Sequence, residues 1–297
     1  MTPQTNTTQT LELSPIVAGL WRITDWNLSV QERVRWIEQA LELGITSFDH
    51  ADIYGDYRAE ALFGEALKAM PALRERMQLV TKCGIRLRSA QRNYQVNYYD
   101  TSAAYVRAQV EQSLRNLHTE RLDLVLIHRP DYLMDAAALA DTFATLIREG
   151  KVQHWGVSNH STSQFALLHQ RHPLLTNQVE LSPLRMDALD DGTLDQAQQL
   201  GLRPMIWSPL GGGRLFTGQD EQAIRVREQM TAIAAHHDIS LATLAFAWVL
   251  RHPSRPHTIT GTGRIEGLRE AIAALDVQLD AEDWYAIWTA SKGHPVP

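Results

Sequence analysis

The feature that most constrains the fold of this chain is the alternation of short aliphatic runs with longer segments of helical periodicity. Runs rich in β-branched or aliphatic residues predict strands at eight places, namely residues 16–20, 45–48, 79–81, 122–127, 152–157, 176–179, 203–207 and 257–260. Between them, apolar residues recur at helical spacing, as at Val106, Val110 and Leu114. Strands that alternate with helices pair in parallel, so eight such units in 297 residues predict a closed (β/α)8 barrel. An open doubly wound sheet is the alternative arrangement.

No Pro/Gly/Ser-rich linker, charge block or low-complexity run marks a boundary between domains. We therefore predict a single domain over residues 1–297, with residues 1–10 as a frayed end or a short hairpin. Gly44, Gly150 and Gly201 each follow a helical segment and precede a strand, which predicts left-handed helix C-caps. Two long connections, 84–100 and 209–219, follow predicted strands and are expected to shape an active site.

The composition is that of an ordinary soluble globular protein, with 44% apolar and 21% charged residues. A net charge of −6 without a basic block argues against a nucleic-acid partner. No apolar stretch reaches the roughly 20 residues that cross a bilayer, and the first ten residues lack the features of a secretory signal. The single cysteine, Cys83, excludes an intramolecular disulfide and disfavours a thiolate zinc site. We therefore expect a cytoplasmic protein with no membrane partner.

Polar side chains stand repeatedly where the predicted strands end. They are Asp49, His50, Lys82, His128, Ser158, Asn159, Gln178, Ser208 and Thr262. In a barrel the C-terminal strand ends converge on one mouth, so these residues predict an active site there. The alternative for any one of them is a polar residue that appears simply because the strand reaches the surface.

Six motifs carry a resemblance to a known family. In chain order they are residues 48–55 (FDHADIYG), 81–82 (TK), 126–130 (LIHRP), 156–159 (GVSN), 177–180 (NQVE) and 207–213 (WSPLGGG). In this order and spacing they resemble the aldo-keto reductases. Within that family the chain is most similar to a bacterial subgroup of NADPH-dependent oxidoreductases, also in its Trp21-Arg22 pair. The resemblance implies a (β/α)8 barrel that binds NADPH across its mouth and reduces an aldehyde or ketone.

The resemblance assigns the proton-donor role to Tyr54. A phenol has a pKa of about 10, and a nearby ammonium favours the phenolate, so we expect Lys82 to lower the pKa of Tyr54. Asp49 would hold the lysine through a charge-assisted hydrogen bond. His128 would bind the substrate by donating to its carbonyl oxygen. A structural ion pair and a core histidine are the alternatives for these residues.

The cofactor residues are likewise implied by resemblance, because the first half of the chain contains no G-x-G-x-x-G fingerprint. They are Ser158, Asn159 and Gln178 for the nicotinamide carboxamide, Trp207 for stacking on the ring, Ser208, Leu210, Gly211 and Gly212 for the pyrophosphate, and Thr262, Gly263, Arg264 and Glu270 for the adenosine end. Many relatives carry arginine where this chain has Gly267 and asparagine where it has Ala271, so the preference for NADPH over NADH rests on Arg264 or Arg269. We place Trp21 at the substrate rim, with Trp26 and the 94–99 loop.

Two other functions remain open from the sequence. One is a metal-dependent barrel hydrolase, with His50, Asp52 and His128 as ligands; the ammonium of Lys82 argues against it, since it would repel a cation, and we expect no metal. The other is a barrel that senses cofactor without turnover. We expect a small-molecule carbonyl substrate as the partner, and a monomer or weak oligomer.

Overall fold

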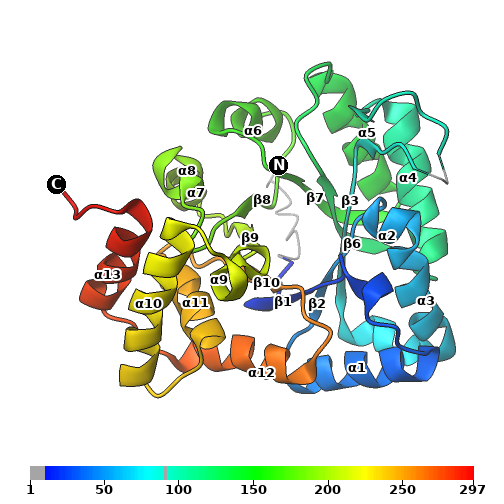
Figure 1. Cartoon of the computed structure of the whole chain (residues 1–297). Coiled ribbons are helices and arrows are strands. Elements are labelled where there is room, and N and C mark those ends of the chain that lie inside the picture. Colours follow the sequence, from blue (N-terminus) through cyan, green and yellow to red (C-terminus); the bar gives the residue numbers. More distant parts are fainter. Residues whose placement is uncertain (1–10, 90–91) are drawn as a thin grey trace, which may run out of the picture.

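The computed structural model describes residues 11–89 and 92–297. The frayed end or hairpin expected over residues 1–10 lies outside the described residues. Eight parallel strands close into a barrel in the order β1-β10-β9-β8-β7-β6-β3-β2 (Figure 1). They are β1 (Ile16–Gly19), β2 (Ser47–Asp49), β3 (Gln78–Cys83), β6 (Leu122–Ile127), β7 (Val152–Ser158), β8 (Asn177–Glu180), β9 (Met205–Trp207) and β10 (His257–Thr260). The closed barrel is confirmed and the open sheet is wrong.

Helices surround the strands on the outside (Figure 1). They are α1 (Val30–Glu42), α2 (Tyr54–Tyr57), α3 (Ala59–Ala69), α4 (Ala103–Asn116), α5 (Ala136–Arg148), α6 (Thr162–His169), α7 (Asp187–Asp190), α8 (Thr193–Gln199), α9 (Arg214–Thr217), α10 (Glu221–His236), α11 (Leu241–Leu250), α12 (Ile265–Ala273) and α13 (Ala281–Lys292). Short 3-10 turns lie at Ile23–Asp25, Pro71–Arg76, Gly211–Gly213 and Ala274–Asp276.

Local sequence signals explain where several helices begin and end. The side chain of Ser29 accepts from the amide of Glu32 at the start of α1, and Ser161 forms a second capping box at the start of α6. Gly44, Gly150 and Gly201 have φ angles of +82°, +73° and +65°, which confirms the predicted left-handed caps. The caps mark where these helices begin, and the left-handed glycines mark where the chain leaves a helix before the next strand.

The barrel has an apolar interior as well as an apolar outer layer. Val17, Val80, Leu124, Met205 and Ile259 form a buried cluster within the ring of strands, and Trp207 packs against that cluster. A larger cluster lies between the strands and the helices. A filled interior leaves the strand ends as the place where polar side chains converge.

The long connection 84–100 contains two short strands that the sequence analysis did not predict. It carries a small antiparallel pair, β4 (Ile85–Arg86) with β5 (Tyr98–Tyr99). Arg86 of β4 connects this pair to the start of α4: it pairs with Asp100 at 2.7 Å, and its guanidinium carbon lies 4.2 Å from the ring centroid of Tyr105. The strands were missed because their pairing depends on these contacts rather than on an aliphatic run.

In the described part of the chain, no single helix is long and apolar enough to cross a membrane. The pair α10 and α11 meets that test only when taken together, by length and composition, and the two helices are bent by 94° at their junction.

Candidate active site

A carboxylate, an ammonium and a phenol meet at the mouth of the barrel. Asp49 ends β2, Lys82 lies near the end of β3, and these two neighbouring strands place both side chains at the same edge. Lys82 Nζ lies 2.6 Å from Asp49 Oδ2 and 3.1 Å from the hydroxyl of Tyr54, and it also donates to the backbone oxygen of His50 at 2.7 Å. The three donor directions of the ammonium are therefore satisfied. Since Lys82 donates to the Tyr54 oxygen, the hydrogen of the phenol is left for another acceptor.

The buried ion pair keeps Lys82 charged. The side chains of Lys82 and Asp49 are only 1% and 4% exposed. Burial alone would lower the pKa of Lys82, but the negative charge of Asp49 and the contact with Tyr54 outweigh it, and the pKa is raised. Gln178 donates to the second carboxylate oxygen of Asp49 at 2.9 Å. Both oxygens of Asp49 thus have a partner.

The pKa of Tyr54 differs from the sequence-based expectation. Burial raises this pKa, and the charge of Lys82 lowers it by less, so the net direction is upward. The expected influence of the lysine is present, but a net lowering is not seen in the protein alone. The phenol is therefore protonated at neutral pH, in the form that a proton donor requires.

His128 lies beside Tyr54, with the two rings edge to face and their centroids 5.8 Å apart. Burial, followed by the charges of Lys82 and Arg129, holds the pKa of His128 well below its usual range, so its imidazole is neutral. Its Nδ1 atom is buried and has no hydrogen-bond partner among the described residues. A neutral imidazole next to the phenol can donate one hydrogen bond to a bound oxygen.

A second group of polar side chains crosses the mouth from β7 to β9. Ser158 Oγ donates to the backbone oxygen of Gln178 at 2.8 Å, and Asn159 Nδ2 donates to Ser158 Oγ at 2.7 Å. Trp207 Nε1 donates to Asn159 Oδ1 at 3.2 Å, which fixes the plane of the indole. Asn159 adopts a left-handed φ of +57°. These four residues, which are expected around the nicotinamide, therefore lie together. The side-chain amide of Gln178 also donates a hydrogen bond to Asp49.

The glycine-rich segment after β9 is only partly available for a phosphate. Gly211, Gly212 and Gly213 have φ angles of +58°, +67° and +99°, and a Cβ on Gly212 or Gly213 would meet nothing within 4 Å. That open space is where a bound group can approach the backbone. The amide of Gly211, however, donates to the backbone oxygen of Ser208 at 2.8 Å. Its predicted role as a phosphate donor needs this turn to open.

The segment expected at the adenosine end precedes α12. Arg264 is exposed at its N-cap position, and its amide donates to Thr262 Oγ1 at 3.1 Å. Arg269 instead pairs with Glu266 at 3.1 Å, and the backbone oxygen of Glu270 accepts from Thr243. A Cβ on Gly267 would lie 2.8 Å from the Thr262 side chain. A larger side chain at position 267 would therefore require the side chain of Thr262 to move.

The two tryptophans expected at the substrate rim differ in environment. Trp21 is 58% exposed, with the Arg22 guanidinium 5.4 Å from its ring centroid. Trp26 is partly buried against Trp36, with ring centroids 4.8 Å apart, and a Cβ on Gly263 would lie 2.6 Å from its ring. Trp26 thus packs against the segment that precedes α12.

The hydrolase ligand set does not assemble in the described residues, where no three His, Cys, Asp or Glu side chains form a potential metal site. His50 is fully buried and packs edge to face on Phe63 of α3 at 4.6 Å. Burial, together with the Lys82 charge, lowers its pKa to about 3. Asp52 is buried near Glu60; burial, then the Glu60 charge, raises its pKa well above the usual range. The sequence showed no sign of this acidic pair.

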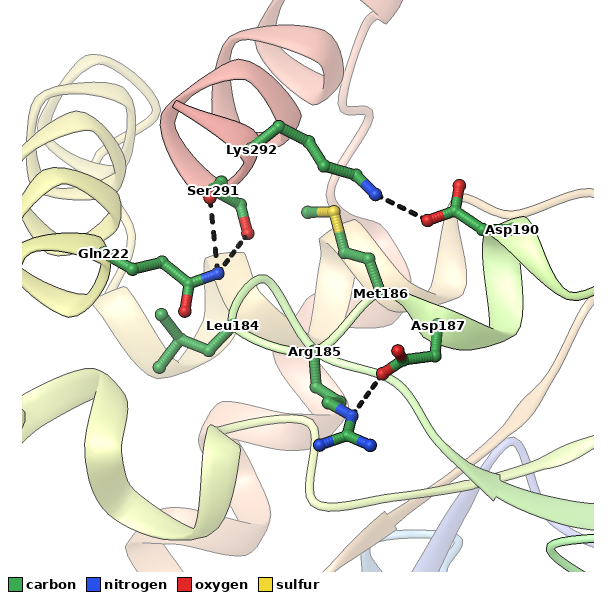
Figure 2. Close-up of a pocket in the computed structure, with 8 residues that line it drawn as sticks. All are labelled: Leu184, Arg185, Met186, Asp187, Asp190, Gln222, Ser291 and Lys292. Carbon is green, nitrogen blue, oxygen red and sulfur yellow. Dashed lines mark hydrogen bonds and ion pairs between the residues drawn. The ribbon is translucent and has the colours of Figure 1, made fainter. Parts of the chain in front are cut away.

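A cavity of about 310 Å³ lies apart from these residues, between the 184–190 segment, α10 and the end of α13 (Figure 2). Lys292 pairs with Asp190 at 2.5 Å, Arg185 pairs with Asp187, and Gln222 donates to Ser291 Oγ at 3.1 Å. Each charged side chain that lines this cavity already has a partner of opposite charge. The mouth of the barrel therefore remains the candidate site.

Sequence reasoning missed one residue of the mouth. Arg129 directly follows His128, and its guanidinium carbon lies 5.8 Å from the ring centroid of Trp207. Arg129 belongs to the 126–130 motif, but no binding or catalytic role was predicted for it from the sequence. The signal was available, since a cation that directly follows a strand-end histidine must lie at the same mouth.

Comparisons with known proteins show the family to which the chain belongs. The model of the aldo/keto reductase family matches residues 15–292. The oxidoreductase YdhF of Escherichia coli K12 is 49% identical over 289 residues, 96% of each chain. A 6-dehydroglucose reductase of Agrobacterium fabrum is 41% identical, over 96% of this chain and 97% of that protein.

A solved structure of an aldo/keto reductase has the same fold. The aldo/keto reductase of Klebsiella pneumoniae, in complex with NADP and acetate, superposes with a TM-score of 0.76 at 26% identity, over 96% of this chain and 93% of that one. The chain therefore belongs to the aldo/keto reductase family of NAD(P)H-dependent oxidoreductases.

Proposed function

We propose that this protein reduces an aldehyde or ketone to the alcohol with NADPH, and that Tyr54 donates the proton. The observation that carries the proposal is the chain of contacts from Asp49 through Lys82 to the Tyr54 hydroxyl, with His128 beside it. Carbonyl reduction needs an acid at the oxygen and a group that orients that oxygen, and these residues supply both.

Each residue of the group has a separate task. The Tyr54 hydroxyl protonates the carbonyl oxygen, and the neutral His128 donates a hydrogen bond to the same oxygen. The Lys82 ammonium stabilises the phenolate that remains, because it already lies 3.1 Å from that oxygen. Asp49 keeps the lysine charged and oriented.

The described residues fit a nicotinamide cofactor. Ser158, Asn159 and Gln178 present amide and hydroxyl groups at one side of the mouth, and Trp207 offers an aromatic face beside them. The open space at Gly212 and Gly213 would admit the pyrophosphate. When bound, the reduced cofactor supplies the hydride. The protein binds and orients the reactants and provides the proton.

The direct test is oxidation of NADPH by the purified protein with a panel of aldehydes and ketones. We include 6-dehydroglucose because two relatives, 41% and 39% identical, are named 6-dehydroglucose reductases. We expect a loss of absorbance that depends on both carbonyl compound and protein. Cofactor binding without turnover of any compound would favour the sensing barrel instead.

The pH profile separates a tyrosine acid from a histidine acid. The pKa of Tyr54 is raised above its usual value of about 10, so the phenol keeps its proton through neutral pH. We expect kcat/KM for reduction to be level between about pH 6 and 9 and to fall only at higher pH. A fall centred at or below about pH 6.5 would contradict this assignment and indicate a histidine acid, because the pKa of His128 is held below its usual range.

The preference for NADPH is expected to depend on Arg264. This exposed side chain stands at the N-terminus of α12, where backbone amides favour an anion such as a 2′-phosphate. We predict tighter binding of NADPH than of NADH, and an approximately tenfold loss of NADPH affinity in Arg264→Gln. Arg269→Gln is the matched control, because Arg269 already pairs with Glu266. Tighter NADH binding, or an equal loss for both cofactors in Arg264→Gln, would overturn the assignment.

A further inference from the structure

Arg129 is a half-buried cation at the mouth that lacks an ion pair. In residues 11–89 and 92–297, no carboxylate oxygen lies within 4.0 Å of its guanidinium. It makes one long hydrogen bond, from Nη1 to the backbone oxygen of His128 at 3.4 Å. Lys82, by contrast, is neutralised by Asp49 at 2.6 Å. Arg86, in the neighbouring loop, is neutralised by Asp100.

The surroundings place this charge next to the proposed chemistry. The guanidinium carbon lies 5.8 Å from the centroid of the Trp207 ring. Burial is the main cause of the lowered pKa of His128 and of His160, and the Arg129 charge lowers both further. Burial raises the pKa of Tyr54, and the Lys82 and Arg129 charges oppose it. The field of Arg129 therefore reaches the reacting groups.

An unpaired, half-buried guanidinium has most of its hydrogen-bonding capacity unused. It presents five donors in a planar fork that matches carboxylates and neighbouring oxygen atoms. Hydrogen bonds from a charged donor are stronger than neutral ones, and a site built for such a bond discriminates against a ligand that lacks the acceptor. Hydrocarbon next to this group would leave the donors unsatisfied.

We propose that Arg129 is a specificity-determining residue that binds oxygen acceptors next to the substrate carbonyl, either a carboxylate or neighbouring hydroxyl groups. The inference rests on the proposed carbonyl reduction and names the class of carbonyl compound that the site prefers. Alkyl aldehydes of the same size are then the poorer substrates.

The test compares two pairs of aldehydes matched in size. The first pair is 4-oxobutanoate and hexanal, and the second is glyceraldehyde and pentanal. With NADPH, we expect the oxygen-bearing member of at least one pair to have the higher kcat/KM. In Arg129→Gln, the ratio of kcat/KM for the oxygen-bearing aldehyde to kcat/KM for its alkyl partner should fall by roughly tenfold to a hundredfold. In Arg129→Lys, this ratio should lie between those of the wild type and Arg129→Gln. The pair that responds identifies the acceptor as carboxylate or hydroxyl.

Binding gives a readout that does not depend on turnover. We expect the alcohol product of the preferred aldehyde to bind the NADP⁺-loaded Arg129→Gln variant at least about tenfold more weakly than the wild type. Arg148→Gln is the matched control, because Arg148 is exposed at the C-terminal end of α5, away from the mouth. It should leave both the ratio and the binding unchanged.

The outcomes separate this inference from the proposed function. If no aldehyde or ketone of the whole panel is reduced, both fail. If another compound is reduced but none of these four aldehydes is, the inference alone fails. If they are reduced but Arg129→Gln leaves both ratios unchanged, the inference alone fails. A loss of NADPH affinity in Arg129→Gln with unchanged substrate ratios also overturns it, because Arg129 would then only support Trp207.

Discussion

Tyr54→Phe is expected to abolish carbonyl reduction while leaving cofactor binding nearly intact. The substitution removes one oxygen atom, which in the protein accepts a hydrogen bond from Lys82 at 3.1 Å. A positioned general acid contributes roughly 10² to 10⁴ in rate, and we expect kcat to fall by that factor. The aromatic ring remains, so packing against His128 is kept. The measurements are the steady-state rate with NADPH and the Kd of NADPH.

Tyr57→Phe provides the control for this prediction. Tyr57 lies three residues further along the chain. Its hydroxyl donates to the backbone oxygen of Leu87 at 3.1 Å and accepts from the amide of Leu87 at 2.8 Å. Removing that hydroxyl changes a loop contact and no reacting group, so most of the activity should remain. Undiminished turnover in Tyr54→Phe would remove the tyrosine from the mechanism. A matching loss of NADPH affinity would assign it to binding instead.

Lys82→Met is expected to impair both activity and stability. Methionine keeps much of the length of the side chain but removes the charge. Among the described residues, the buried carboxylate of Asp49 then keeps only Gln178 as a side-chain donor. Removing one partner of a buried ion pair costs about 3–5 kcal/mol of unfolding free energy. The rate should fall as well, because the phenolate of Tyr54 loses the ammonium that lies 3.1 Å from its oxygen.

The double variant Asp49→Asn/Lys82→Met separates these two effects. The double variant removes the uncompensated charge of Asp49. Denaturant unfolding should therefore give a free energy of unfolding closer to that of the wild type, while the rate of carbonyl reduction stays low. Recovery of the rate in the double variant would show that the lysine charge is not needed for catalysis. An unchanged stability in Lys82→Met would contradict the coupling of the pair.

Much of the architecture was predictable because it depends on local patterns. The eight aliphatic runs match the eight barrel strands, and Gly44, Gly150 and Gly201 adopt the predicted left-handed caps. The position of the site followed from the same pattern, since parallel strands bring their C-terminal ends together. Asp49 and Lys82 lie within hydrogen-bonding distance for that reason, whereas Tyr54, at the start of α2, was assigned through the family resemblance.

What could not be predicted depends on three-dimensional surroundings. The net direction of the Tyr54 pKa reflects the balance of burial against the Lys82 charge, which no spacing reveals. The bond from Gln178 to Asp49 joins residues 129 positions apart. The amide of Gly211 is occupied because the turn closes on Ser208. That Arg129 has no ion pair among residues 11–89 and 92–297 is visible only once the neighbouring carboxylates have been placed.

The most direct measurement is a crystal structure of this protein with NADPH. We predict that the nicotinamide ring lies against Trp207, with its carboxamide near Asn159 and Gln178 and its reactive carbon beside the Tyr54 hydroxyl. A nicotinamide bound away from Tyr54 and Lys82, with those side chains facing only protein, would contradict it.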